Sequence, residues 1–132
     1  MNGIDYVLDT NIILYVIGGM IEQNVLPDGV FSISFITELE TLSYPSLSDD
    51  EKREITNFLD NISIIDIDKE IKGHTISLRK NYNIKLPDAI IAATAISQNA
   101  ILITNDKQFL KISELKSQGL NLKLKESDSE NS

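Results

Sequence analysis

The sequence predicts a three-layer α/β/α fold, in which helices cover both faces of a central, mostly parallel sheet of four to five strands. Short runs of β-branched and apolar residues alternate with longer stretches of helical spacing, which is typical of βαβ units. Strands joined through helices run parallel and form a sheet that is covered on both faces. The chain has 132 residues, 42% of them hydrophobic, which fits one domain with a substantial core.

The first part of the chain contains three predicted strands, at 4–9, 30–34 and 63–67. The helices predicted with them are 10–17, 20–25, 36–44 and 49–60. Gly18 and Gly19 end the first of these helices, and Pro45 follows the third. Ser48 and Glu51 have the spacing of a capping box, which predicts the start of the fourth.

The second part of the chain continues the alternation. Helices are predicted at 68–81, 87–99 and 107–112, a strand at 100–104 and an edge strand at 120–124. The segment 87–99 is apolar nearly all round, so we expect it to be the most buried helix. The domain is expected to span 1–124, followed by a polar, disordered tail at 125–132.

Composition restricts the classes of function. The chain has no cysteine, which excludes disulfides and thiolate metal sites and suits a reducing cytoplasm. A net charge of −8 argues against a surface that attracts nucleic acid everywhere, but carboxylates loaded with divalent cations can still meet a phosphate. No run of about eighteen apolar residues predicts a membrane span. Asp5 and Asp9 interrupt the N-terminal apolar segment, so no signal peptide is predicted.

Acidic residues gather where the predicted strands end. Binding sites in open parallel sheets form outside the carboxyl ends of the strands. Asp9 follows the first strand and Asp106 follows the fourth. Glu38 and Glu40 lie on the helix after the second strand, and Asp88 begins the apolar helix. Crowded carboxylates repel one another unless a cation joins them, and oxygen ligands favour Mg²⁺ or Mn²⁺.

The same acids also fit helix caps, because acids and hydroxyls are favoured at helix N-termini. Asp9 and Thr10 could cap the first helix, and Asp106 precedes a short helix. Thr37 and Glu40 have the spacing of a second capping box. Taken singly, each acid fits a cap better than a metal ligand. Capping does not require the acids to converge, however, so their joint placement favours a shared site.

Four segments of the chain resemble the signature segments of a known family. "VLDTNIILY", "ISFITELETLSY", "LPDAIIAATA" and "ILITNDKQF" occur in this order over roughly 4–112. They resemble PIN-domain ribonucleases, and most of all the VapC-type toxins of prokaryotic toxin–antitoxin pairs. The resemblance implies an endoribonuclease that binds one or two Mg²⁺ or Mn²⁺ ions. It also implies a small antitoxin partner and a homodimer.

By this resemblance, the catalytic and metal-binding acids are Asp9, Glu40, Asp88 and Asp106. Thr10, Asn11 and Thr104 match positions that support these carboxylates. The helical wheel does not distinguish Glu38 from Glu40, since each lies about 100° from Leu39 at the centre of the apolar stripe. The resemblance selects Glu40 and leaves Glu38 as the alternative.

Cationic residues flank the third and fourth segments. Lys85, Lys107 and Arg79 could neutralise RNA phosphates, although a solvated surface explains them equally well. The single histidine, His74, stands apart from the signature segments and gives little support to a Ser–His–Asp triad.

We therefore expect a metal-dependent endoribonuclease that hydrolyses RNA phosphodiester bonds and needs no protein nucleophile. A catalytically silent module of the same fold, which binds a partner protein or RNA and uses the acids as caps, is the alternative. A Mg²⁺-dependent phosphatase with Asp9 as nucleophile is a third possibility. Such enzymes usually carry a second acid two residues on, where this chain has Asn11.

Overall fold

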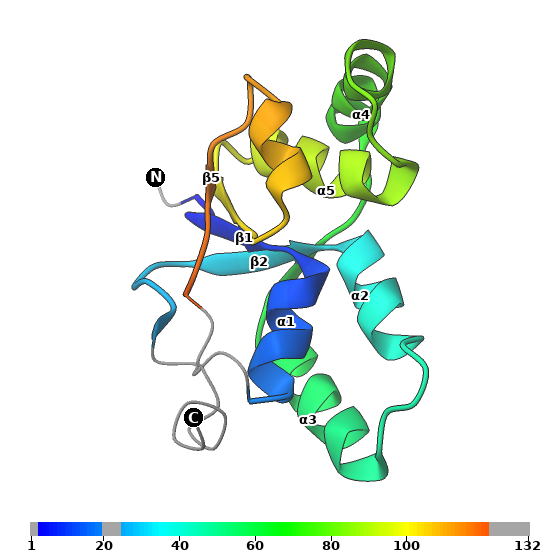
Figure 1. Ribbon diagram of the computed structural model, residues 1–132, viewed down its shortest axis with the longest axis vertical. Helices are drawn as coiled ribbons and strands as arrows, with labels where there is room; N and C mark the ends of the chain where they lie inside the picture. Colours follow the sequence, from blue (N-terminus) through cyan, green and yellow to red (C-terminus); the bar gives the residue numbers. More distant parts are fainter. Residues whose placement is uncertain (1–2, 20–24, 122–132) are drawn as a thin grey trace, which may run out of the picture.

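The structure, a computed structural model, describes residues 3–19 and 25–121. In these residues a five-stranded sheet has the order β3-β2-β1-β4-β5, and every neighbouring pair is parallel. Helices α4 and α5 lie on one side of the sheet, and α1 and α3 lie on the other (Figure 1). The predicted three-layer α/β/α fold with a parallel sheet is confirmed.

The strands are short and lie within or beside the predicted segments. They are β1 (Tyr6–Leu8), β2 (Phe31–Ser34), β3 (Ser63–Ile65), β4 (Ile101–Ile103) and β5 (Ser117–Gln118). The helices are α1 (Thr10–Ile17), α2 (Phe35–Leu42), α3 (Asp49–Asp60), α4 (Lys69–Asn81), α5 (Leu86–Ser97) and the 3₁₀ helix η2 (Lys107–Lys111). In the described part of the chain, no helix is long and apolar enough to cross a membrane.

The edge strand was predicted in the wrong place. Strand β5 pairs Ser117 with Leu102 and Gln118 with Ile103, so it ends before the predicted segment 120–124 begins. The alternating pattern of that segment suggested a strand, but the backbone of Leu120 is bound instead by the side-chain amide of Asn105. Residues 122–124, the tail at 125–132 and nearly all of the predicted helix at 20–25 lie outside the described residues.

Two apolar clusters hold the layers together. Val7 and Leu102 on one face of the sheet pack in the same cluster as Ile91 of α5. Leu8, the next residue along β1, points to the other face and belongs to the cluster that contains Ile12 of α1. Successive side chains of a strand point to opposite faces, so β1 is buried on both sides. All residues of α5 from 89 to 95 are buried, which confirms that it is the most buried helix.

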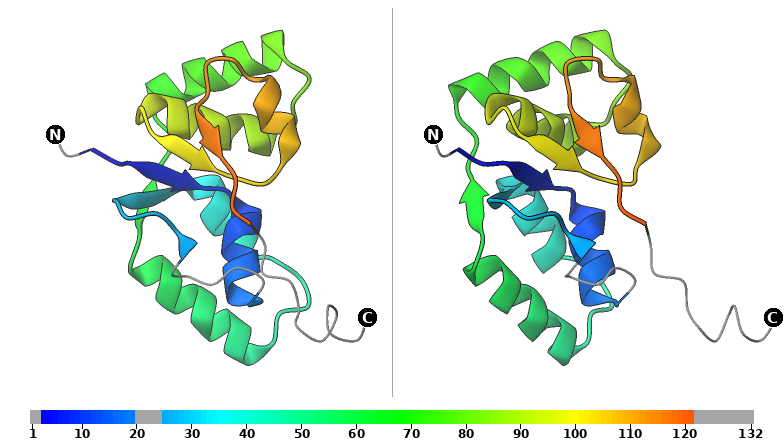
Figure 2. Two further views of the ribbon diagram at one scale, coloured as in Figure 1. Left: turned by 60° about the vertical axis from the view of Figure 1, so that its left-hand side comes forward. Right: turned by 90° about the vertical axis from the view of Figure 1, so that its left-hand side faces the viewer.

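The parallel strands deliver their carboxyl ends to one edge of the sheet (Figure 2). At this edge β1 runs directly into α1, β2 runs into α2, and β4 leads to η2. Helix α2 lies between α1 and α5 and is in contact with both. Because these junctions are short, the side chains that follow each strand have little conformational freedom. They include acids that the sequence analysis proposed as site residues.

Candidate active site

The four predicted acids line one pocket at the carboxyl edge of the sheet. The pocket has a volume of about 310 Å³. Its walls are formed by Asp9, Thr10, Asn11, Leu14, Glu40, Ser43, Tyr44, Pro45, Asp88 and Asp106. These residues come from α1 and the residue before it, α2 and the segment after it, the start of α5 and the start of η2. Four separate segments of the chain therefore bring carboxylates to one place.

Asp9 is the most buried of these acids, with 4% of its surface exposed. Its Oδ1 accepts a hydrogen bond from the Thr10 amide at 2.8 Å, which makes it the cap of α1. Its Oδ2 accepts from the Thr104 hydroxyl at 2.6 Å. Burial raises the pKa of Asp9 to about 6; the hydrogen bonds from Thr104 and Thr10 lower it, and the charges of Asp88 and Asp106 raise it further. One oxygen of Asp9 therefore caps α1, as the capping interpretation expected. The ionised carboxylate is still disfavoured by burial and by the neighbouring acids.

Glu40 is held toward the pocket by a residue from another element. The Thr10 hydroxyl donates to Glu40 Oε1 at 2.6 Å and lies 3.1 Å from the hydroxyl of Thr37. Glu40 is part of the pocket lining, whereas Glu38 is not. The capping box predicted for Thr37 and Glu40 is wrong, because α2 begins at Phe35 and its cap is Ser34, which accepts from the Ile36 amide.

Asp88 and Asp106 share a hydrogen-bond donor that the sequence did not indicate. Gln108 Nε2 donates to Asp106 Oδ2 at 2.7 Å and to Asp88 Oδ2 at 3.1 Å. Asp106 also caps η2, since its Oδ1 accepts from the Gln108 amide at 3.1 Å. The one available signal was that Gln108 stands two residues after a predicted capping acid, which places the two side chains close together.

Thr104 connects two of the acids. Its hydroxyl donates to Asp9 and accepts from the backbone amide of Asp106 at 3.0 Å. Both the start of α1 and the start of η2 are thereby fixed to the end of β4. Asn11, the third predicted supporting residue, lines the pocket and is exposed.

The three predicted RNA contacts differ in their surroundings. Lys85 precedes α5, and its charge lowers the pKa of Asp88. Lys107 is exposed on η2, beside Asp106. Arg79 donates from Nη1 to the carbonyl oxygen of Ile84 at 2.8 Å, so it holds the connection between α4 and α5. Lys85 and Lys107 therefore remain the better candidates for a phosphate.

The donor set suits Mg²⁺ or Mn²⁺, because all the charged groups are hard carboxylate oxygens. Burial raises the pKa of Asp88, as do the charges of Asp106 and Glu40, while its hydrogen bond from Gln108 lowers it. Among the described residues no three acids form a ready-made cage. Mg²⁺ usually binds through one or two carboxylates and keeps several waters, so the site does not require such a cage.

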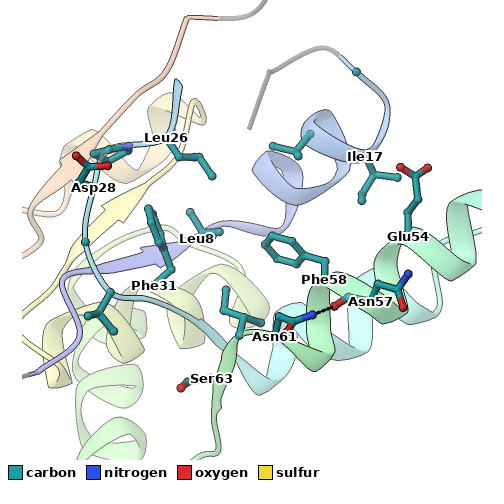
Figure 3. A pocket seen from close by; sticks show the side chains of 16 residues that line it. Leu8, Ile17, Leu26, Asp28, Phe31, Glu54, Asn57, Phe58, Asn61 and Ser63 are labelled. Atoms are coloured by element: carbon teal, nitrogen blue, oxygen red, sulfur yellow. Dashed lines mark hydrogen bonds between the residues drawn. The ribbon is translucent and has the colours of Figure 1, made fainter. Parts of the chain in front are cut away.

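A larger cavity of about 1340 Å³ lies elsewhere, next to α1 and α3. Figure 3 shows its two acids, Asp28 and Glu54, on opposite sides, with Leu8, Phe31 and Phe58 between them. Its lining includes Gly19 and Leu26, which border the undescribed residues 20–24. Its acids do not converge, so the smaller acidic pocket is the candidate active site.

The chain matches a known protein family. The PIN domain profile matches residues 6–115, and the chain belongs to the PIN domain family. PIN domains are nucleases, so fold and family together define the general class of activity. A comparison with curated proteins found no match.

Several solved structures that resemble this chain come from toxin–antitoxin complexes. The chain is 31% identical to a chain of VapBC-1 from nontypeable Haemophilus influenzae, with a TM-score of 0.70 over 86% of this chain and 96% of that one. It is 27% identical to a chain of VapBC2 from Rickettsia felis bound to a promoter DNA fragment, with a TM-score of 0.76 over 88% and 98%. A toxin–antitoxin complex from Klebsiella pneumoniae matches at 29% identity, with a TM-score of 0.70 over 84% and 95%. The predicted resemblance to VapC-type PIN toxins is confirmed.

Proposed function

We propose that this chain is a Mg²⁺- or Mn²⁺-dependent endoribonuclease and the toxin of a toxin–antitoxin pair. The observation that carries the proposal is the convergence of Asp9, Glu40, Asp88 and Asp106 in one pocket of a PIN domain. Burial and mutual repulsion raise the pKa of Asp9 and of Asp88, so the pocket favours a bound cation.

The chain's own groups supply binding and orientation. The four carboxylates would hold one or two cations, directly or through water. A bound divalent cation supplies an activated water and polarises the phosphate. Thr104 fixes Asp9, and Thr10 fixes Glu40, so both acids are oriented before a ligand arrives. Lys85 and Lys107 would meet neighbouring phosphates of the RNA.

The test compares RNA cleavage by the wild type with cleavage by Asp9→Asn, using a pool of random-sequence single-stranded RNA and added Mg²⁺. Asn keeps an oxygen for the Thr10 amide but removes the charge, so the fold should persist. We expect the rate to fall more than about 100-fold, or about 2.7 kcal/mol of transition-state stabilisation.

Asp68→Asn is the matched control. Asp68 caps α4 by accepting from the Ile71 amide at 2.8 Å, and it is not part of the pocket lining. Its variant should cleave RNA at the wild-type rate. Equal rates for Asp9→Asn and the wild type, or a wild type that cleaves no RNA with Mg²⁺, would contradict the proposal.

The proposal extends to partners. Solved structures similar to this chain are toxin–antitoxin complexes, which supports a small antitoxin as the binding partner. We also expect a homodimer in the cytoplasm, as the resemblance and the absence of cysteine indicate. Leu39 and Leu42 of α2 and Leu86 of α5 expose about half of their surfaces and are apolar side chains that an interface could cover.

A further inference from the structure

The side chain of Gln108 joins the two acids on one side of the pocket. One nitrogen, Nε2, lies 2.7 Å from Asp106 Oδ2 and 3.1 Å from Asp88 Oδ2. A primary amide has two N–H donors, so one nitrogen can serve both carboxylates at once. Donors facing charged acceptors form stronger hydrogen bonds than neutral pairs. The amide therefore places partial positive charge between two groups that repel each other.

The backbone of Gln108 is fixed independently of its side chain. Its amide N–H donates to Asp106 Oδ1 at 3.1 Å, within the cap of η2. The next residue, Phe109, is 1% exposed and packs in the same apolar cluster as α5. The residue itself is half-buried. Rotation of the side chain is therefore possible while the helix stays in place.

A cation that joined Asp88 and Asp106 through their Oδ2 atoms would approach the two oxygens that now accept from Gln108. An N–H donor and a cation cannot face one oxygen lone pair together. Where the cation takes the lone pairs that face Nε2, the amide turns away or rotates so that its Oε1 replaces Nε2. Either movement gives up two hydrogen bonds that stabilise the metal-free protein.

We propose that Gln108 is a positioning residue that holds Asp88 and Asp106 together in the metal-free protein and competes with the divalent cation for them. This inference rests on the proposed metal-dependent function and deepens it. Gln108 lowers the affinity for the cation because its hydrogen bonds stabilise only the metal-free state. The side chain thus sets the cation concentration at which the site fills.

The test measures the Mn²⁺ dissociation constant by calorimetry for the wild type, Gln108→Met and Gln108→Lys. Met has a similar length and no donor, so its metal-free state loses the bridge, and Mn²⁺ should bind roughly 10-fold more tightly. Lys keeps donors and adds a charge, so Mn²⁺ should bind more weakly than in the wild type. The melting temperature of metal-free Gln108→Met should fall, which shows that tighter binding does not come from a more stable fold.

Gln98→Met is the matched control, since Gln98 follows α5 ten residues after Asp88, or about 15 Å along the helix. Its Mn²⁺ affinity should equal that of the wild type. Unchanged or weaker Mn²⁺ binding by Gln108→Met, with a wild type that binds Mn²⁺ and cleaves RNA, would overturn this inference alone. No Mn²⁺ binding by any of these proteins would overturn both the inference and the proposed function.

Discussion

Asp9 shows how one carboxylate serves the fold and is also a candidate metal ligand. Its two oxygens accept from the Thr10 amide and the Thr104 hydroxyl, and these contacts fix the start of α1 to the end of β4. The residue is nevertheless buried beside other acids, which disfavours its ionised form. The contacts orient the group without neutralising it. In the metal-free protein, the charge of Asp9 therefore costs stability.

That cost predicts a pH-dependent stability. The pKa of Asp9 is about 6 in the folded protein, against 3.8 for an aspartate in the unfolded chain, so Asp9 contributes stability that is fully present below pH 3.8. The contribution is lost as the pH rises through about 6, because the folded state then gives up its proton. A shift of about two pKa units corresponds to about 3 kcal/mol. Asn has no proton to lose. At pH 8 and without metal, the free energy of unfolding of Asp9→Asn should therefore exceed that of the wild type by up to this amount.

The measurement is denaturant unfolding of both proteins at pH 4 and pH 8, without divalent cations. Most of the difference should disappear at pH 4, where the wild-type carboxyl is largely protonated when folded. A difference of the same size at both pH values would mean that Asn acts through packing or hydrogen bonding, and the electrostatic account of Asp9 would be wrong.

At the scale of helices and strands, one capping-box spacing marks a helix start and another does not. Ser48 and Glu51 form the predicted capping box of α3. Thr37 and Glu40 have the same spacing, yet α2 already begins at Phe35. The difference arises because β2 runs into α2 with no loop between them, so the helix starts where the sheet ends. Spacing alone does not contain that information.

The capping box of α3 leads to a stability prediction. Ser48 Oγ accepts from the Glu51 amide at 3.1 Å, and Glu51 Oε1 accepts from the Ser48 amide at 2.9 Å. Ser48→Ala should lower the free energy of unfolding by about 1 kcal/mol, because α3 loses the acceptor for one N-terminal amide. Neither residue lines the acidic pocket, so RNA cleavage should be unchanged.

Ser77→Ala in the exposed part of α4 is the control for this change. Ala is favoured in helix interiors, so this variant should be as stable as the wild type or slightly more stable. Chemical denaturation of the three proteins at one pH provides the comparison. Equal losses in both variants would show that removal of a hydroxyl, and not loss of the cap, lowers the stability.

At the scale of the whole molecule, the alternation of strands and helices was enough to predict the layers and the edge where the acids meet. The helical wheel did not distinguish Glu38 from Glu40, and only the family resemblance selected Glu40. The contact that holds Glu40 comes from the hydroxyl of Thr10, which lies thirty residues away in the sequence and on another helix. The bridge made by Gln108 also joins two elements, η2 and α5. Periodicity locates a residue on its own helix, whereas these contacts depend on how helices pack against each other.

The convergence of four segments predicts that a divalent cation stabilises the whole fold. A ligand that binds only the native state adds about 2.7 kcal/mol at 100 times its dissociation constant, which is on the order of 10 °C in melting temperature for a domain of this size. Titration of Mn²⁺ at pH 7.5 and constant ionic strength should therefore raise the melting temperature of the wild type. Asp9→Asn should respond less, since one carboxylate is missing, and Asp68→Asn should respond fully.

In a silent module the acids would serve only as caps, as Asp9 and Asp106 also do here, and all three proteins would melt at temperatures independent of Mn²⁺. A flat titration of the wild type would thus favour the interaction module over the nuclease.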